Sequence, residues 1–227
     1  MFKYSALLVP PILAILLAAC GSSDNDDGSS SLPQGGGEVS YRLTFSSTWS
    51  ANTFPTQHPS NAHFSPVVGA THSAQTIIWR PQDQPSTSGI ESVAETGSTS
   101  SFKSELNVQK EQGYVDTVFS ANGAFNSPGD QSIVFKVSEQ HSLVSAISML
   151  APSPDWFVGI RDVQLFENGE WIDSKSFDLK LYDAGTDTAD NFSSANADGG
   201  DRTIQLVTTA TENTDFTNGV NRNSGAF

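Results

Sequence analysis

Two acidic loops carry the residues best suited to chemistry in this chain. The first, PSPDW, places Asp155 between two apolar runs, and its prolines keep the backbone out of regular structure. The second, DAGTD, holds Asp183 and Asp187 on either side of Gly185, which permits a tight turn. Close carboxylates repel one another unless a cation relieves them, and Ca²⁺ takes about 6–8 oxygen ligands in irregular geometry. The pattern indicates either a calcium site or aspartates that cap turns through backbone N–H groups.

Strands must position these loops, and short runs of alternating apolar residues predict them. The runs lie at Val39–Phe45, Thr76–Trp79, Tyr114–Phe119, Ser132–Val137, Val144–Leu150, Phe157–Ile160, Val163–Phe166, Phe177–Tyr182 and Ile204–Val207. Asn168 and Gly169 predict a hairpin, because both residues tolerate positive φ. A chain that leaves one acidic loop and returns through a single hairpin brings both loops to one end of a sheet. We therefore expect Asp155, Asp183 and Asp187 to converge.

Helical patterns are few. Ser88–Glu91 is typical of a capping box that begins a short helix, and Ser101–Lys110 fits either a second short helix or a strand. Many short strands with one or two short helices predict an all-β fold, an antiparallel β-sandwich, over residues 39–210. The segment 211–227 is polar and Asn-rich, and we expect it to be poorly ordered.

The N-terminus predicts export. Residues 1–19 combine Lys3 with an apolar run, Leu7–Leu17, that is shorter than the roughly 20 residues of a membrane-spanning helix. The run ends in LAAC, which resembles the bacterial lipobox and implies that Cys20 is lipidated and becomes the mature N-terminus. The alternative is an ordinary signal peptide followed by a chance cysteine. Cys20 is the chain's single cysteine, which excludes a disulfide within the chain, and residues 20–38 read as a flexible tether.

The net charge of −14 disfavours nucleic acid and anionic lipid as partners. It is compatible with cation binding, and also with simple solubility of an exported protein. Gly21 and Ser22 follow the cysteine. By resemblance to enteric sorting rules, they favour the outer membrane, on its periplasmic side or at the cell surface.

Three longer motifs point to a family. They are AHFSPVVGATH at Ala62–His72, PSPDWFVG at Pro152–Gly159 and DAGTD at Asp183–Asp187. Together they resemble the spondin N-terminal domain, and the resemblance covers roughly Val39 to Thr208. It implies a β-sandwich similar to calcium-binding C-two-type domains, with a calcium ion held by Asp155, Asp183 and Asp187.

The chain also departs from that family. Its animal members carry cysteines and thrombospondin repeats downstream, which are missing here, so their matrix-adhesion roles need not transfer with the fold. An additional stretch, Asn196–Asp201, either adds a ligand through Asp198 or Asp201 or forms a solvated turn.

Other constellations are weaker. His63 and His72 lack a third ligand at zinc spacing, and we expect them to hydrogen-bond loop backbone. Trp156, next to Asp155, is a candidate for the rim of a ligand site, as are the two histidines. The nucleophile motif G-x-S-x-G does not occur.

The sequence therefore predicts a lipid-anchored, extracytoplasmic, calcium-binding module without enzymatic activity. The module would serve for adhesion or for binding of an extracellular or envelope macromolecule. The alternatives are a metal- or His/Asp-dependent hydrolase of envelope polymers and a purely structural envelope lipoprotein.

Overall fold

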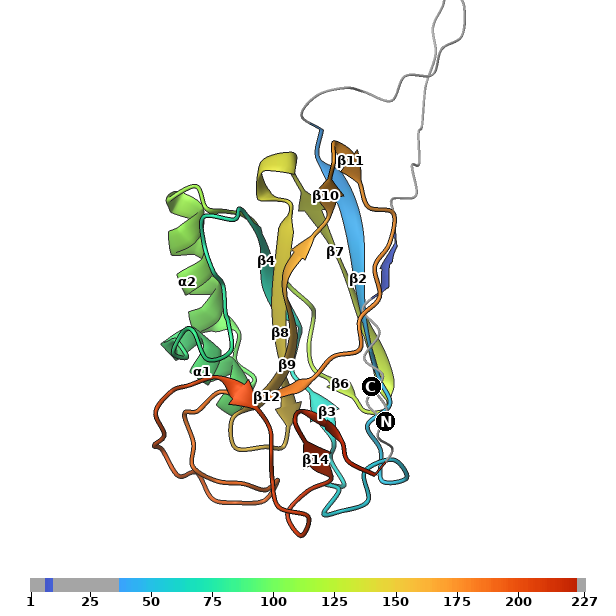
Figure 1. The fold of residues 1–227 in the computed structure, drawn as a ribbon, viewed down its shortest axis with the longest axis vertical. Helices are drawn as coiled ribbons and strands as arrows, with labels where there is room; N and C mark the ends of the chain where they lie inside the picture. Colours follow the sequence, from blue (N-terminus) through green and yellow to red (C-terminus); the bar gives the residue numbers. More distant parts are fainter. Residues whose placement is uncertain (1–6, 10–36, 224–227) are drawn as a thin grey trace, which may run out of the picture.

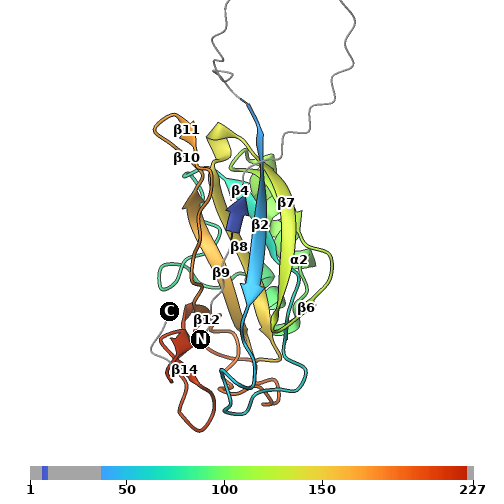
Figure 2. The same ribbon diagram turned by 90° about the vertical axis from the view of Figure 1, so that its right-hand side faces the viewer.

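The computed structural model describes residues 7–9 and 37–223, and these residues form three layers (Figure 1). One outer layer is an antiparallel sheet in the order β1-β2-β7. The middle layer is a larger antiparallel sheet centred on β8 and β9, and the other outer layer consists of the helices α1 and α2. Figure 2 looks onto the sheet that contains β2 and β7. The predicted antiparallel β-sandwich with two short helices is confirmed.

The elements have the following bounds. In the first sheet they are β1 (Leu7–Val9), β2 (Val39–Ser47) and β7 (Gly129–Val137). In the larger sheet they are β3 (His63–Phe64), β4 (Val68–His72), β5 (Val115–Ser120), β6 (Phe125–Asn126), β8 (Leu143–Ala151), β9 (Trp156–Gln164), β12 (Leu181–Asp183) and β13 (Gln205–Leu206). Two separate hairpins are β10 (Phe166–Glu167) with β11 (Glu170–Trp171) and β14 (Phe216–Thr217) with β15 (Val220–Asn221). The helices are α1 (Ser88–Thr96) and α2 (Ser100–Glu111), with a 3₁₀ turn at Glu139–His141.

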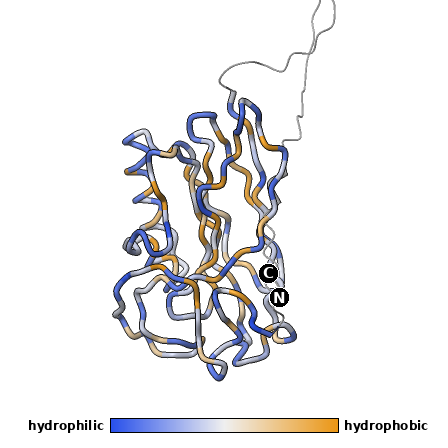
Figure 3. Tube along the Cα trace, viewed as in Figure 1, coloured by the Kyte–Doolittle hydropathy of each residue, from blue (hydrophilic) through white to orange (hydrophobic). Residues whose placement is uncertain are grey.

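The hydrophobic pattern explains the layers. Tyr41, Leu43 and Phe45 of β2 are buried against the larger sheet, while the residues between them face outward, as a half-buried strand requires. Strand β8 is buried along almost its whole length because it has a core on each side. Val144 packs between the sheets and Ile147 packs under the helices. Figure 3 shows the apolar residues following the strands and the inner side of the helices.

The helices settle one open alternative, because Ser101–Lys110 lies within α2 and is not a strand. Helix α1 begins as predicted near Ser88, but its N-cap is Thr87, whose side chain accepts a hydrogen bond from the Ile90 N–H group at 3.2 Å. It ends at Gly97, whose φ of 69° is the left-handed conformation typical of a C-terminal glycine. Helix α1 packs against β8 and β9, and helix α2 packs against β5 and β4.

The strand predicted at Thr76–Trp79 is wrong, and the one predicted at Phe177–Tyr182 is only partly met. Thr76–Trp79 forms no strand; Trp79 is instead buried beneath the helices, and its Nε1 donates to the Ile160 carbonyl at 3.1 Å. Of the run Phe177–Tyr182, only its end belongs to β12. The hairpin at Asn168 and Gly169 is confirmed, with φ values of 55° and 83°.

The expected poorly ordered tail, residues 211–227, needs correction for its described part. Phe216 in β14 is fully buried, and β15 pairs with β14. Asp215 is 2% exposed and accepts hydrogen bonds from the backbone N–H and the hydroxyl of Thr56 at 2.6 and 2.7 Å. Three polar residues of this segment, Thr214, Asp215 and Asn221, are therefore buried, whereas Thr211, Glu212 and Asn218 are exposed. Residues 224–227 lie outside the described residues.

The described part of the chain holds no helix that is long and apolar enough to cross a membrane. The predicted lipidation residue, Cys20, and residues 10–36 around it lie outside the described residues. Strand β1, within the predicted signal peptide, pairs with β2 so that Leu8 lies opposite Leu43.

Candidate functional site

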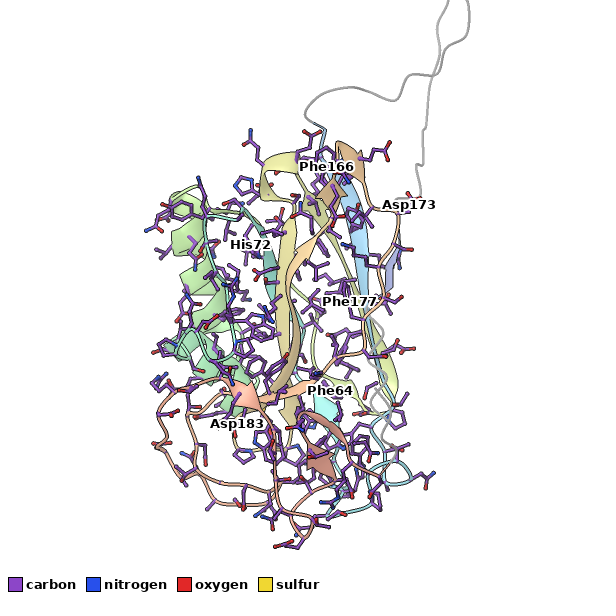
Figure 4. The ribbon with its side chains drawn as sticks, viewed as in Figure 1. Phe64, His72, Phe166, Asp173, Phe177 and Asp183 are labelled. Carbon is purple, nitrogen blue, oxygen red and sulfur yellow. The ribbon has the colours of Figure 1, made fainter. Side chains whose placement is uncertain are left out.

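The register of the larger sheet places the two acidic loops side by side. Asp155 ends the turn that joins β8 to β9, and Asp183 is the last residue of β12. Because β12 pairs with β9 and Asp183 lies opposite Trp156, the two aspartates meet at one end of the sheet. Asp187 lies in the turn that follows. Figure 4 shows Asp183 where β12 opens into the loops at the lower end of the molecule.

Asp155 holds the second acidic loop in place through hydrogen bonds. Its side chain is fully buried, and Oδ2 accepts hydrogen bonds from the N–H groups of Thr186 and Asp187 at 2.7 and 3.1 Å. Oδ1 is also buried, but it has no hydrogen-bond partner among the described residues. Burial raises the pKa of the Asp155 carboxyl, and the N–H groups of the loop oppose that rise.

Asp183 and Asp187 each fix a turn. Asp183 Oδ1 accepts from the Gly185 N–H at 2.7 Å, and Asp187 accepts from Ala189 N at 2.7 Å and Ala197 N at 3.0 Å. Burial, reinforced by the charge of Asp155, raises the pKa of Asp183 to about 7. The turn-capping alternative therefore describes hydrogen bonds that exist. These hydrogen bonds do not relieve the mutual repulsion of the carboxylates.

A cleft opens above these aspartates, and its wall includes Asp183, Asp187, Asp190 and Asp201. Among the described residues, no group of three or more His, Cys, Asp or Glu side chains is placed to hold a metal ion by itself. A cation at this end therefore needs backbone carbonyls and water as well as carboxylates, as calcium commonly does. The donors here are all oxygen, and the buried, unpartnered Asp155 Oδ1 is an atom that a hard cation would satisfy. The residues fit calcium.

Comparison with known proteins decides the family. The Spondin_N family model matches residues 39–219. The chain belongs to the spondin N-terminal domain family. This spondin domain is 35% identical to human spondin-2 over 196 residues, which is 85% of this chain and 59% of that protein. It is 38% identical to rat spondin-2 over 160 residues, 69% of this chain and 48% of the relative.

Rat spondin-1 is 34% identical over 169 residues, which cover 70% of this chain and 20% of the relative. The chain thus spans less than two thirds of the length of these relatives. The family match confirms the resemblance. It also runs past residue 210, so it takes in part of the segment that we expected to be a tail.

Of the predicted rim residues of the spondin domain, Trp156 lies in the wall of the acidic cleft, whereas His72 lies away from it. Trp156 is fully buried and packs against Phe192 and Phe216, at ring distances of 5.6 and 5.9 Å. His72 is fully buried too, and it lies toward the opposite end of the larger sheet (Figure 4). His63 is half-buried, and its Nδ1 lies 2.7 Å from the Asn61 carbonyl.

The two aspartates of the additional stretch Asn196–Asp201 have different surroundings. Asp198 is exposed, and its Oδ1 accepts from Asn196 Nδ2 at 2.7 Å, which is a turn interaction. Asp201 accepts from the Thr203 N–H at 2.8 Å but also lines the cleft.

Sequence reasoning missed Arg202, which joins the loops to helix α1. Its backbone N–H donates to the Gly185 carbonyl at 2.8 Å, and its guanidinium donates to Glu91 Oε2 at 2.6 Å and to the Ser86 carbonyl at 3.0 Å. An isolated arginine in a polar stretch gives no sequence signal for such a link. The link holds the second loop against the helix layer.

Buried His72 predicts a loss of stability in acid. Its Nε2 lies 2.9 Å from Ser145 Oγ, and burial lowers the pKa of its imidazole below 6.5. Below pH 6.5 the unfolded chain binds a proton that the folded chain resists, so this contribution to stability is present above pH 6.5 and lost as pH falls. Urea denaturation between pH 7.5 and 5 should show a smaller acid loss in His72→Gln than in the native protein. Equal losses in the two proteins would contradict this role.

Proposed function

We propose that this spondin domain is a calcium-stabilised, non-enzymatic binding module that works outside the cytoplasm. The observation that carries the proposal is the buried Asp155 Oδ1, which has no partner among the described residues and lies within a group of mutually repelling carboxylates. Asp155, Asp183 and Asp187 would hold the ion, with loop carbonyls and water completing its ligands. Bound calcium would supply charge neutralisation at the two loops.

Three residues of the chain fix the position of the loops without the ion. Asp155 ties the second loop to the start of β9 through two backbone N–H groups, and Asp183 shapes the turn at Gly185. Arg202 fixes the same loop to α1. The loops are therefore pre-organised before a cation arrives, which limits the conformational entropy that binding must offset.

Thermal melting with calcium and with chelator tests the proposal. At a calcium concentration about 100 times Kd, binding should stabilise the fold by about 2.7 kcal/mol. Asp183→Asn should abolish most of that shift, whereas Asp130→Asn, an exposed control on β7, should keep it. A native protein that melts at the same temperature in both buffers would refute the calcium site.

The pH dependence gives a second signature. With chelator, folded Asp183 keeps its proton up to about pH 7 while the unfolded chain releases it near pH 4. The Asp183 contribution to the free energy of unfolding therefore falls as pH rises through that window. Calcium competes with that proton, so the calcium-dependent shift in melting temperature should be larger at pH 8 than at pH 5.5. Asp183→Asn should remove this difference.

The hydrolase alternative finds no support at the histidines. His72, Ser145 and Asp162 do approach one another, with His72 Nε2 3.8 Å from Asp162 Oδ1. His72 and Ser145 are both fully buried, so a polymer could not reach either side chain. The accessible acidic end, where the loops meet, is the better candidate for a face that binds a macromolecule. Retention of envelope or matrix polymers on the immobilised protein, with calcium and with chelator, tests that part.

Anchoring through Cys20 is part of the same proposal and rests on the LAAC motif. Metabolic labelling with a fatty acid in a bacterial host should mark the native chain and leave Cys20→Ser unlabelled. Fractionation of the native protein should place the label in the outer membrane. Label on the Cys20→Ser protein would contradict this attachment point.

A further inference from the structure

Helix α1 ends in a carboxylate at an electrostatically unfavourable position. Glu95 lies in the last turn of the helix, where the helix dipole disfavours negative charge, and that turn contains no basic residue. Burial raises the pKa of Glu95, and the negative charges of Glu91, Asp155 and Asp187 raise it further. A side chain that breaks the local electrostatic rule in this way is often part of a functional site.

The side chain of Glu95 points into the protein. Its Oε1 atom is buried and has no hydrogen-bond partner among the described residues, which is also true of Asp155 Oδ1. Both carboxylates interact with Thr186, Asp155 through Oδ2 at 3.3 Å from the Thr186 hydroxyl, so the two side chains approach the same residue from different layers of the fold. The neighbouring cation, Arg202, is engaged by Glu91 of the same helix. A buried carboxylate oxygen without a hydrogen-bond partner favours a positive neighbour, and both Glu95 Oε1 and Asp155 Oδ1 are of this kind.

We propose that Glu95 is a further ligand of the divalent cation, so that helix α1 closes the site from the side opposite the cleft. This inference rests on the proposed calcium site and adds a residue to it. Two buried oxygens, Glu95 Oε1 and Asp155 Oδ1, then find their partner in the same ion. The cation joins the helix layer to both acidic loops, a connection that the loop motifs alone do not contain.

Calorimetric titration of the purified protein with calcium tests the assignment. Glu95→Gln keeps the shape of the side chain and should weaken calcium binding by about tenfold or more. Glu111→Gln is the matched control, because Glu111 is an exposed carboxylate in the last turn of the neighbouring helix. It should bind calcium with native affinity. In chelator, Glu95→Gln should be at least as stable as the native protein, since it removes a repelling charge, whereas a merely structural Glu95 would make it less stable.

Terbium luminescence supplies a direct readout of ligation. Tb³⁺ replaces Ca²⁺ at oxygen sites, and its lifetimes in H₂O and D₂O report the number of water molecules on the ion. Glu95→Ala should add water to the bound ion, and Glu111→Ala should not. Native calcium affinity and an unchanged water count in the Glu95 variants, with binding lost in Asp155→Asn, would overturn the role of Glu95 and leave the loop site standing. No calcium binding by the native protein would overturn both.

Discussion

Asp155→Ala is expected to lower the free energy of unfolding by about 3 kcal/mol in calcium-free buffer. The substitution leaves the N–H groups of Thr186 and Asp187 buried without an acceptor, and an unsatisfied buried group costs about 1–3 kcal/mol. Relief of carboxylate repulsion offsets part of that cost, because Asp155 and Asp183 raise each other's energy. Urea denaturation in chelator at pH 7 measures the balance.

Asp155→Asn separates hydrogen bonding from charge. The amide oxygen of asparagine can still accept from the loop N–H groups, so this variant should keep most of the calcium-free stability. It should nevertheless lose the stabilisation by calcium, because the charge that attracts the ion is gone. If Asp155→Ala unfolds within about 0.5 kcal/mol of the native protein, as surface substitutions usually do, then Asp155 does not organise the loop.

The parts of the fold that could be predicted are those where one physical signal dominates. Alternation in β2 and the Asn168-Gly169 turn were sufficient because burial and positive φ act locally. The meeting of the two acidic loops followed from a single hairpin between them. Helix α2 stayed ambiguous because only Phe102 and Leu106 of its residues are buried, while Val108 is 54% exposed.

The site could be predicted only where the chain itself brings residues together. Asp155 immediately precedes β9 and Asp183 ends β12, these two strands pair directly, and the two motifs carry the family resemblance. Glu95 and Arg202 reach the same place from α1 and from a long loop, a tertiary arrangement without a local pattern. The orientation of Trp156 depends on Phe192 and Phe216, which arrive from the distant C-terminal part of the chain.

Phe216→Ala should be among the most damaging single substitutions in this protein. Phe216 is fully buried, and its ring lies 5.3 Å from that of Phe54 and 5.9 Å from that of Trp156. Truncating a buried phenylalanine costs about 3–5 kcal/mol. At about 2–4 °C per kcal/mol for a domain of this size, the melting temperature should fall by roughly 10 °C. Val134→Ala, at a site that is 58% exposed, is the control and should change it little.

The same substitution connects the C-terminal segment to the calcium loops. Trp156 follows Asp155 directly and packs against Phe216, so the cavity left by alanine lies beneath the first acidic loop. Calcium affinity should therefore fall in Phe216→Ala, though less than in Asp155→Asn, because every proposed ligand is still present. Native melting temperature and native calcium affinity in this variant would mean that residues 211–223 are only loosely attached. A loss of both would make the C-terminal segment a structural support of the loops, although its polar sequence predicts a free tail.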